Sequence, residues 1–405
     1  MSARRVVITG MGSISALGHD SKQQWQAMCE GRSGIGPITT ISTDLLNVKI
    51  AAEVHDYDPL TFFEQKRLGI LDRVSQFALI AAREAVNQSG LNFRDGIGER
   101  TACIVGTGVG GETTHNEQSR RFYEDKNPRV HPLTIVRMMA NAPASQITME
   151  YGVTGPAFAV VSACASANHA MSQAFEMIRS GRTDFALTGG TEACVTVTTV
   201  KAWEAVRVTA DDTCRPFCRQ RRGMVLGEGA GIFVLEEYEH AKKRGAHILA
   251  EFAGYGMSAD AGDIVMPSQA GAARAISDAL RDSQLNVEDI GYINAHGTAT
   301  PANDPTESKA IRRVFGDRAN ALAVSSTKSM HGHALGAAGA IELIAAIGAL
   351  REGVIPPTAN FIDPDPECDL DYVPNTAREK KIHAVLSNSF AFGGLNSVVA
   401  LKKAE

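Results

Sequence analysis

The chain of 405 residues is long enough for two or three domains, and its 44% hydrophobic and 21% charged residues are typical of a folded protein. Its 40 Lys and Arg against 45 Asp and Glu give a net charge of −5, which argues against a protein that mainly neutralises a nucleic-acid backbone. The absence of a long apolar run and of a secretory signal in the opening residues predicts a soluble cytoplasmic protein.

Short β-branched runs that end in glycine predict buried strands that lead into tight loops. In the first half such runs lie at residues 6–10, 101–106 and 185–190. Between the first two, the stretch from Asp72 to Gly90 has the apolar spacing of a helix that ends at glycine. The order of these elements predicts an α/β fold.

One cysteine lies where a predicted strand turns into a predicted helix. The run 157–163 is strand-like, whereas the residues after Cys164 have helical apolar spacing up to Gly181. A thiol at a helix N-terminus meets the positive end of the helix dipole, which favours the thiolate, and a backbone N–H there can join an oxyanion hole. The local pattern equally fits a buried cysteine that fills space, so other residues must decide.

The second half repeats the rhythm of strands and helices. Strands are predicted at 291–295, 321–325 and 383–387, and an apolar helix at 337–350. Glycine pairs at 189–190 and 393–394 occupy comparable places near the end of each half, which indicates a duplication. We place the two halves at residues 1–255 and 256–405.

Two histidines follow predicted strands of the second half. His296 comes directly after the strand at 291–295, and His333 follows a strand-like run at 324–330. Strand ends are where α/β proteins gather site residues, so both are site candidates. His331 shares the loop of His333, and spacing alone does not separate the two.

The predicted helix after His333 carries a single charge, Glu342, on a segment that is apolar nearly all round. A buried carboxylate needs a partner, and Lys328 in the preceding segment is the natural candidate. Such a pair would shift the pKa of a nearby imidazole. The alternative is a Glu342 side chain that lies on the surface.

The cysteines are odd in number and widely spread, which predicts reduced thiols rather than a disulfide framework. They are Cys29, Cys103, Cys164, Cys194, Cys214, Cys218 and Cys368. Zinc is the competing use, and Cys214 and Cys218 with His331 and His333 come nearest to ligand spacing. Because neither pair fits the common zinc motifs, we expect no metal.

Four separated motifs, in a fixed order, are highly specific in combination. They are Val161–Ala165 around Cys164, His296–Pro301, Ser326–His333 and Asn388–Gly394. Together they resemble the β-ketoacyl-acyl-carrier-protein synthases of the elongating, Cys-His-His type. The resemblance spans essentially the whole chain and includes the segments 6–12, 214–217, 227–231 and 353–358.

The resemblance implies a duplicated thiolase-like fold, five-layered α-β-α-β-α, in a tight dimer. It implies that Cys164 accepts an acyl chain from a carrier-protein thioester and that His296 and His333 support decarboxylation of malonyl-carrier protein. The enolate then attacks the acyl-cysteine and extends the chain by two carbons. A thiolate suits this role because it is both nucleophile and leaving group. No cofactor is implied, since phosphopantetheine arrives on the carrier protein.

The family also implies roles for residues around these three. The N–H groups of Cys164 and Phe392 would hold the thioester oxygen, Phe392 would gate access, and Lys328 and Glu342 would support the histidine loop. The other implied site residues are the phosphopantetheine contacts Thr298 and Thr300, the substrate-binding residues Thr199, Trp203, Val109 and Phe390, and a polar network of Asp304, Glu307 and Asn396.

The expected partners are an acyl carrier protein and a second subunit, the same chain or a chain-length-factor-like one. Because a carrier protein is acidic, a local basic patch must meet it despite the net negative charge. The candidates are Lys66, Arg67, Arg120, Arg121 and Arg207, of which Arg207 is close to the family's docking position. The alternative for each is a solvated surface charge. We expect no nucleic acid and no membrane partner.

Several residues depart from the housekeeping members of the family. Ala391 replaces a glycine before Phe392, which predicts altered movement of the gating loop. Val265 replaces a usual hydroxyl side chain, and Trp203 and Thr199 add bulk beside the acyl pocket. These departures resemble specialised condensing enzymes of nodulation-factor and polyene synthesis, and we expect a specialised, polyunsaturated acyl product.

A second hypothesis is a non-catalytic chain-length-factor-like subunit of a ketosynthase heterodimer. Such subunits typically lose the cysteine. The presence of Cys164, His296 and His333 argues against this reading.

Overall fold

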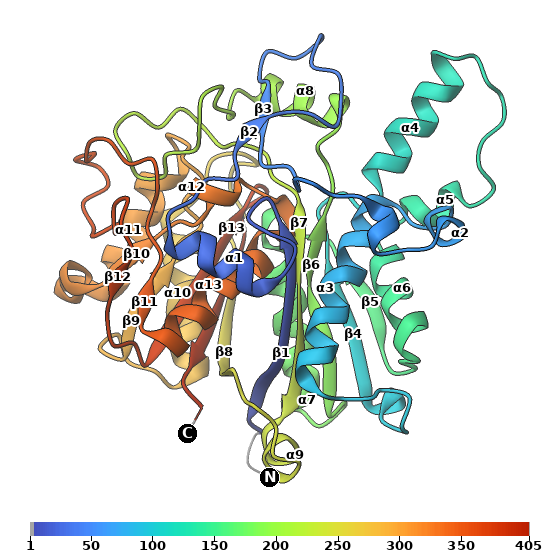
Figure 1. The fold of residues 1–405 in the computed structure, drawn as a ribbon. Helices are drawn as coiled ribbons and strands as arrows, with labels where there is room; N and C mark the ends of the chain where they lie inside the picture. Colours follow the sequence, from blue (N-terminus) through green and yellow to red (C-terminus); the bar gives the residue numbers. More distant parts are fainter. Residues whose placement is uncertain (1–3, 405) are drawn as a thin grey trace.

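The computed structural model describes residues 4–404, so residues 1–3 and 405 of the two predicted halves lie outside the described part. Ten strands form one continuous hydrogen-bonded sheet (Figure 1). It divides into two sets of five strands, which we call the first and the second sheet. The first set is β5 (Ala157–Val160), β4 (Thr101–Gly106), β6 (Phe185–Glu192), β7 (Gly229–Glu237) and β1 (Val6–Ser15). The second is β10 (Ala323–Ser325), β9 (Ile290–Asn294), β13 (Ala384–Ala391), β14 (Leu395–Lys402) and β8 (Ala250–Ala259).

The two sets have the same topology. Numbered by chain position within its set, each has the order 3-2-4-5-1, in which strands 3, 2 and 4 are parallel and strands 5 and 1 are antiparallel to their neighbours. The first strands of both sets, β1 and β8, pair with each other at the centre. The duplication indicated by the glycine pairs is therefore confirmed. The second set begins at Ala250, so the predicted boundary between residues 255 and 256 falls within β8.

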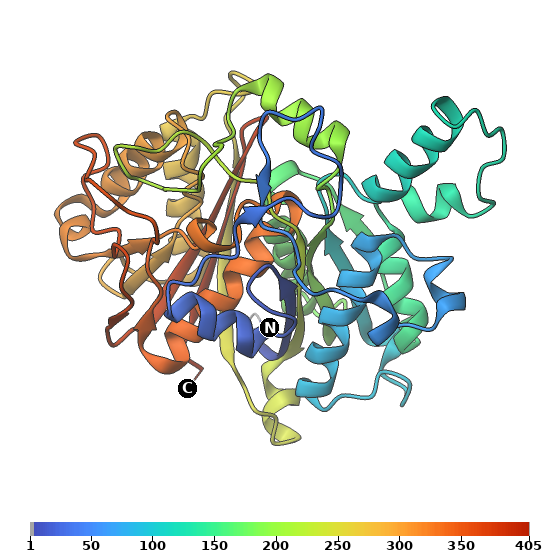
Figure 2. The same cartoon turned by 45° about the horizontal axis from the view of Figure 1, so that its top comes forward.

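Helices form three layers around the two sheets. The outer layers are α3 (Arg73–Ser89) with α6 (Ala142–Tyr151) on the first sheet and α10 (Gln269–Ser283) with α11 (Asn303–Phe315) on the second. Between the sheets lie α7 (Ser166–Arg179) and α13 (Ala338–Glu352), which contact strands of both halves (Figures 1 and 2). This arrangement confirms the predicted five-layered fold.

Local sequence explains where these helices begin and end. The Asp72 carboxylate accepts the Val74 N–H at 2.9 Å and caps α3, and Gly90 ends that helix with φ of 68°. Helix α13 is buried on every side from Ala338 to Leu350, which fits its place between two sheets. The strand predicted at 324–330 is wrong beyond Ser325, because the next N–H groups bond back to carbonyls three or four residues earlier and form α12 (Lys328–His331).

Shorter elements complete the chain around this core. They are α1 (Ser21–Cys29), α2 (Gln65–Leu68), α4 (Glu112–Tyr123), α5 (Thr134–Met138), α8 (Val197–Val206), α9 (Tyr238–Lys243), and the short strands β2 (Gly36–Pro37), β3 (Ile50–Ala51), β11 (Val354–Ile355) and β12 (Arg378–Glu379). Helix α4 and the chain that follows it stand away from the layered body (Figure 2). All seven cysteines are free thiols. Within residues 4–404 no helix is long and apolar enough to cross a membrane.

Candidate active site

The two inner helices begin with equivalent strained turns. A one-turn 3-10 helix, Ala163–Ala165, leads into α7, and another, Leu335–Ala337, leads into α13. The first residue of each turn has a positive φ, 49° for Ala163 and 41° for Leu335, which costs energy for a residue with a side chain. Both turns lie between the sheets, so the duplicated fold brings Cys164 and the loop of His333 to the same place.

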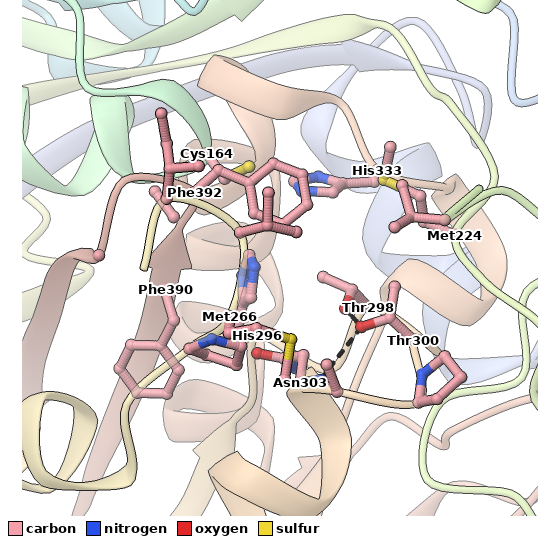
Figure 3. Close-up of a pocket in the computed structure, with 18 of the residues that line it drawn as sticks. Cys164, Met224, Met266, His296, Thr298, Thr300, Asn303, His333, Phe390 and Phe392 are labelled. Atoms are coloured by element: carbon pink, nitrogen blue, oxygen red, sulfur yellow. Dashed lines mark hydrogen bonds between the residues drawn. The ribbon is translucent and has the colours of Figure 1, made fainter. Parts of the chain in front are cut away.

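A sulfur from the first half meets two imidazoles from the second. One ligand atom each of Cys164, His296 and His333 lie within 4.8 Å of one another, and the side chains are 6%, 2% and 1% exposed. The two imidazole rings are nearly perpendicular, with centroids 5.4 Å apart (Figure 3). The structure thus brings together the three groups that the motifs single out.

His296 is fixed by a buried carboxylate behind it. The N–H groups of His296 and Gly297 donate to the two oxygens of Glu307 at 2.9 and 2.8 Å, and the Asn388 amide donates to the same carboxylate at 3.0 Å. Asp304 accepts the Phe217 N–H at 2.7 Å. These bonds hold the loop after β9 under the cavity.

Lys328 and Glu342 form an ion pair in the interior. Both side chains are fully buried and the ammonium donates to the carboxylate, so the surface alternative for Glu342 is wrong. The Lys328 Nζ also lies 3.4 Å from His296 Nδ1. Burial raises the pKa of Glu342 to about 7, against the opposing effect of Lys328.

The two imidazoles are held in the neutral form. Burial lowers the pKa of His296 and of His333 well below the usual value, and the Lys328 charge lowers both further. Among the described residues neither nitrogen of His333 has a hydrogen-bond partner. A neutral imidazole offers one N–H, so His333 is available to donate to an oxygen in the cavity.

The resting cysteine is a thiol, contrary to the expectation from its place at a helix N-terminus. Burial raises the pKa of Cys164 to about 11. The Lys328 charge and the N–H groups of Phe392 and Cys164 lower it, but not enough to offset desolvation. The same N–H groups are the two that the family resemblance assigns to the oxyanion hole.

A cavity leads outward from these groups and contains most of the implied substrate contacts. Thr298 and Thr300 lie on one wall with their hydroxyls 2.9 Å apart, and Phe390 lines the cavity across from them (Figure 3). Trp203 packs on Phe392 with ring centroids 5.6 Å apart. The lining residues that the sequence did not indicate are Val208, Met224, Met266, Pro267, Ala302 and Asn303.

Other implied residues lie elsewhere. Thr199 bonds to Thr196 and Glu112, and Val109 is 47% exposed; neither lines the cavity. Asn396 donates to Asp260 at 2.7 Å and to Ser258 at 3.2 Å, so it belongs to a different polar cluster from Asp304 and Glu307. Ala391 lies in the extended strand β13, where alanine is unstrained; the positive φ values fall on the next two glycines.

The candidate docking residues lie on three separate helices. Lys66 and Arg67 are on α2, Arg120 and Arg121 on α4, and Arg207 at the end of α8. Arg67 is paired with Glu150 at 2.5 Å, and Arg120 with Asp125 at 3.4 Å. Arg207 is exposed and precedes Val208 of the cavity wall, which makes it the candidate at the cavity mouth.

His331, which spacing did not separate from His333, is not in the cavity wall and contacts the Thr327 hydroxyl at 3.0 Å. Burial lowers the pKa of His331 to about 3. As the pH falls below about 6.5, this imidazole therefore binds a proton in the unfolded chain but not in the folded chain. Between these values folding loses about 1.4 kcal/mol for each unit that the pH falls. We expect His331→Gln to flatten the pH dependence of the unfolding free energy below pH 6.5 by that amount, as measured by urea denaturation. An equal flattening by His383→Gln, at an exposed position, would contradict this.

The chain was compared with known proteins. Residues 3–241 match the model of the β-ketoacyl synthase N-terminal domain, and residues 249–362 match that of the C-terminal domain. Nodulation protein E of a Rhizobium species is 50% identical over 99% of both chains. A 3-oxoacyl-[acyl-carrier-protein] synthase 2 of Synechocystis sp. is 41% identical, covering 100% of this chain and 99% of that one. The structure titled the ishigamide ketosynthase/chain length factor is 39% identical with a TM-score of 0.95, over 100% of both chains.

Proposed function

The chain belongs to the β-ketoacyl synthase family and is an acyl-transferring enzyme, and we propose that it extends an acyl chain held on Cys164 by decarboxylative condensation with malonyl-carrier protein. The observation that carries this proposal is the meeting of Cys164 with His296 and His333 at the end of an open cavity. A subunit that only sets chain length has no use for a nucleophile in that place.

In the first half-reaction the Cys164 sulfur attacks the thioester carbonyl of an acyl-carrier protein. A new C–S bond forms, the carrier's thiol leaves, and it takes the proton that the cysteine gives up. The developing oxyanion is stabilised by the N–H groups of Phe392 and Cys164. Because the resting thiol is neutral, its proton must leave as the carbonyl is attacked. Lys328 favours the transient thiolate.

In the second half-reaction the malonyl thioester loses CO₂ by cleavage of its C–C bond, and negative charge moves to the thioester oxygen. Neutral His296 and His333 donate hydrogen bonds to that oxygen in a buried site. The enolate carbon then attacks the acyl-cysteine, a C–C bond forms, and the Cys164 thiolate leaves. Thr298 and Thr300 would orient the phosphopantetheine arm in the cavity.

We expect no resident metal or cofactor. A cysteine and two histidines are also a ligand set that zinc accepts. Here the Lys328 ammonium lies 3.4 Å from His296 Nδ1, and its charge would repel a second cation. Phosphopantetheine would arrive with the carrier protein as part of the substrate.

For the acyl chain, we propose an unsaturated, planar substrate. Trp203 and Phe392 are two large aromatic side chains that line the same cavity as Cys164, and aromatic rings favour a flat conjugated chain over a coiling saturated one. The 50% identity to a nodulation protein E agrees with a role beside the housekeeping pathway.

We expect polyenoyl-carrier proteins to acylate the enzyme at least several-fold faster than saturated C8 to C14 ones. Intact mass spectrometry after incubation with a panel of acyl-carrier proteins reports the preferred chain as added mass. Trp203→Phe, which keeps one aromatic ring, should lower the preference for polyenoyl chains slightly. Trp203→Leu, which keeps none, should lower it more. Equal or faster acylation by the saturated primers would refute the proposal of an unsaturated substrate, but it would not contradict the proposed condensing activity.

An acyl carrier protein and a second subunit are the proposed partners. The relative titled a ketosynthase/chain length factor supports a heterodimer, and Arg207 at the cavity mouth supports docking of an acidic carrier. The molecular mass in solution of this chain alone, and of the chain mixed with a chain-length-factor-like subunit, distinguishes a homodimer from a heterodimer. A homodimer unchanged by that subunit would exclude the heterodimer.

A further inference from the structure

A second buried carboxylate, Glu192, lies close to the reacting groups and has no part in the steps above. It ends strand β6 and is fully buried. Its two oxygens accept hydrogen bonds from the N–H groups of Gly108 and Val109 at 2.6 and 3.3 Å and from the Thr107 hydroxyl at 3.0 Å. The fourth donor is the N–H of Gly336, at 2.9 Å. All four partners are N–H or O–H donors, the set that a carboxylate needs.

These bonds cross from one half of the fold to the other. Gly108 follows β4 of the first half, whereas Gly336 is in the turn between His333 and α13 of the second. The two N–H groups share one carboxylate oxygen, Oε2. We call this junction of residues 107–109, Glu192 and Gly336 the Glu192 seam.

Glycines make the close approach at the seam possible. A Cβ at Gly336 would collide with the backbone nitrogen of Gly108, and a Cβ at Gly108 would lie 2.7 Å from Glu192 Oε2. A Cβ at Gly190, two residues before the end of β6, would lie 2.7 Å from the Gly336 carbonyl oxygen. Backbones from three segments therefore meet there with no side chain between them, and the carboxylate is the group that links them.

The imidazole of His333 needs such support. Among the described residues no hydrogen bond holds its ring, so its place depends on the backbone on either side. On one side its own N–H donates to Val225 at 2.7 Å, and its carbonyl accepts from Gly227 at 3.0 Å. On the other side, the Ala334 carbonyl bonds only within the turn, to the Ala337 N–H, and the next described N–H that bonds to another segment is that of Gly336, in the seam.

We propose that Glu192 is a positioning residue for the condensation step, which holds the turn after His333 to the nucleophile half and so sets the spacing between the Cys164 sulfur and the His333 ring. The inference rests on the proposed function of that site. Acyl loading needs Cys164 and its N–H donors, all of which are independent of His333. Decarboxylation and condensation need His333 as well, so a loosened seam should slow the second half-reaction and spare the first. Burial raises the pKa of Glu192 to about 7, and its charged form raises the pKa of Cys164, so loss of that charge should not slow loading through the ionisation of the thiol.

The test compares Glu192→Gln and Glu192→Ala in the full-length enzyme. Loading is followed by intact mass spectrometry, and decarboxylation by CO₂ release from malonyl-carrier protein. Glutamine keeps the length and one acceptor oxygen, so the second half-reaction should stay within about threefold of wild type. Alanine should slow it by at least about tenfold while loading stays within about twofold. The matched control is Glu84→Ala, because within residues 4–404 the Glu84 carboxylate accepts hydrogen bonds only from Ser13 and Ser21, both in the first half.

Two results would overturn the proposal. One is a Glu192→Ala enzyme with wild-type decarboxylation. The other is an equal loss of loading and decarboxylation in Glu192→Ala, no more selective than any loss that Glu84→Ala shows, which would show a merely structural role. If wild-type enzyme fails to take up an acyl chain, the proposed function is what fails. The seam is then judged by crystal structures of wild type and Glu192→Gln or Glu192→Ala, and an unchanged distance between Cys164 and His333 in the alanine variant would refute it.

Discussion

Replacement of Cys164 by alanine should abolish covalent acylation and lower condensation by about 10⁴-fold or more, because no other group at the site can hold the acyl chain. Decarboxylation of malonyl-carrier protein should persist, since the imidazoles that stabilise the enolate belong to the other half of the fold. Intact mass spectrometry after incubation with acyl-carrier protein measures the first effect, and CO₂ release measures the second.

Cys194→Ala is the matched control for this experiment. Cys194 is a second fully buried thiol in the same apolar cluster as Cys164, yet it does not line the cavity. Its removal should cost some stability and leave the acyl adduct at full yield. An adduct formed at the wild-type rate by Cys164→Ala would refute the assignment of Cys164 as the nucleophile. Loss of the adduct in Cys194→Ala would show that a void left by any buried side chain of this cluster is enough to abolish acylation.

The sequence was informative wherever the relevant signal is local. Apolar runs that end in glycine placed the sheet strands, and Asp72 and Gly90 marked the ends of α3, because capping depends on a few neighbouring residues. The burial of Glu342 could be inferred because its whole helix is apolar. Motif residues led to Cys164, His296 and His333 through resemblance, and the folded chain then showed why they meet.

What the sequence could not give depends on contacts summed over distant segments. The high pKa of Cys164 comes from burial among residues of both halves, which outweighs the local effect of the helix N-terminus. Glu192 has the same origin. It lies two residues beyond the predicted strand at 185–190, like an ordinary polar boundary residue, and only the approach of Gly336, 144 residues away, makes it a buried link. The strand predicted at 324–330 failed because residues buried on every side carry no alternation to distinguish a strand from a helical turn.

The buried pair Lys328 and Glu342 should give the largest change in stability. We expect Lys328→Met to lower the free energy of unfolding at pH 8 by about 3–5 kcal/mol, because it leaves a buried carboxylate without its partner. Glu342 already has a pKa of about 7, and loss of the Lys328 charge raises that pKa further above the unfolded value. The folded variant therefore binds a proton that the unfolded chain does not, so its stability should recover as the pH falls from 8 to 6. Urea denaturation at the two pH values measures both effects.

Two further variants separate the charge from the packing. Lys328→Met with Glu342→Gln removes both charges and should recover much of the loss, whereas Lys309→Met, at an exposed pair with Glu367, should leave unfolding nearly unchanged. The activity of Lys328→Met should change as well. Lys328 lowers the pKa of His296, so without it that imidazole protonates at higher pH and the acid limb of the condensation profile moves upward. An acid limb that stays in place while stability falls would show that the lysine supports the fold and does not tune the histidine.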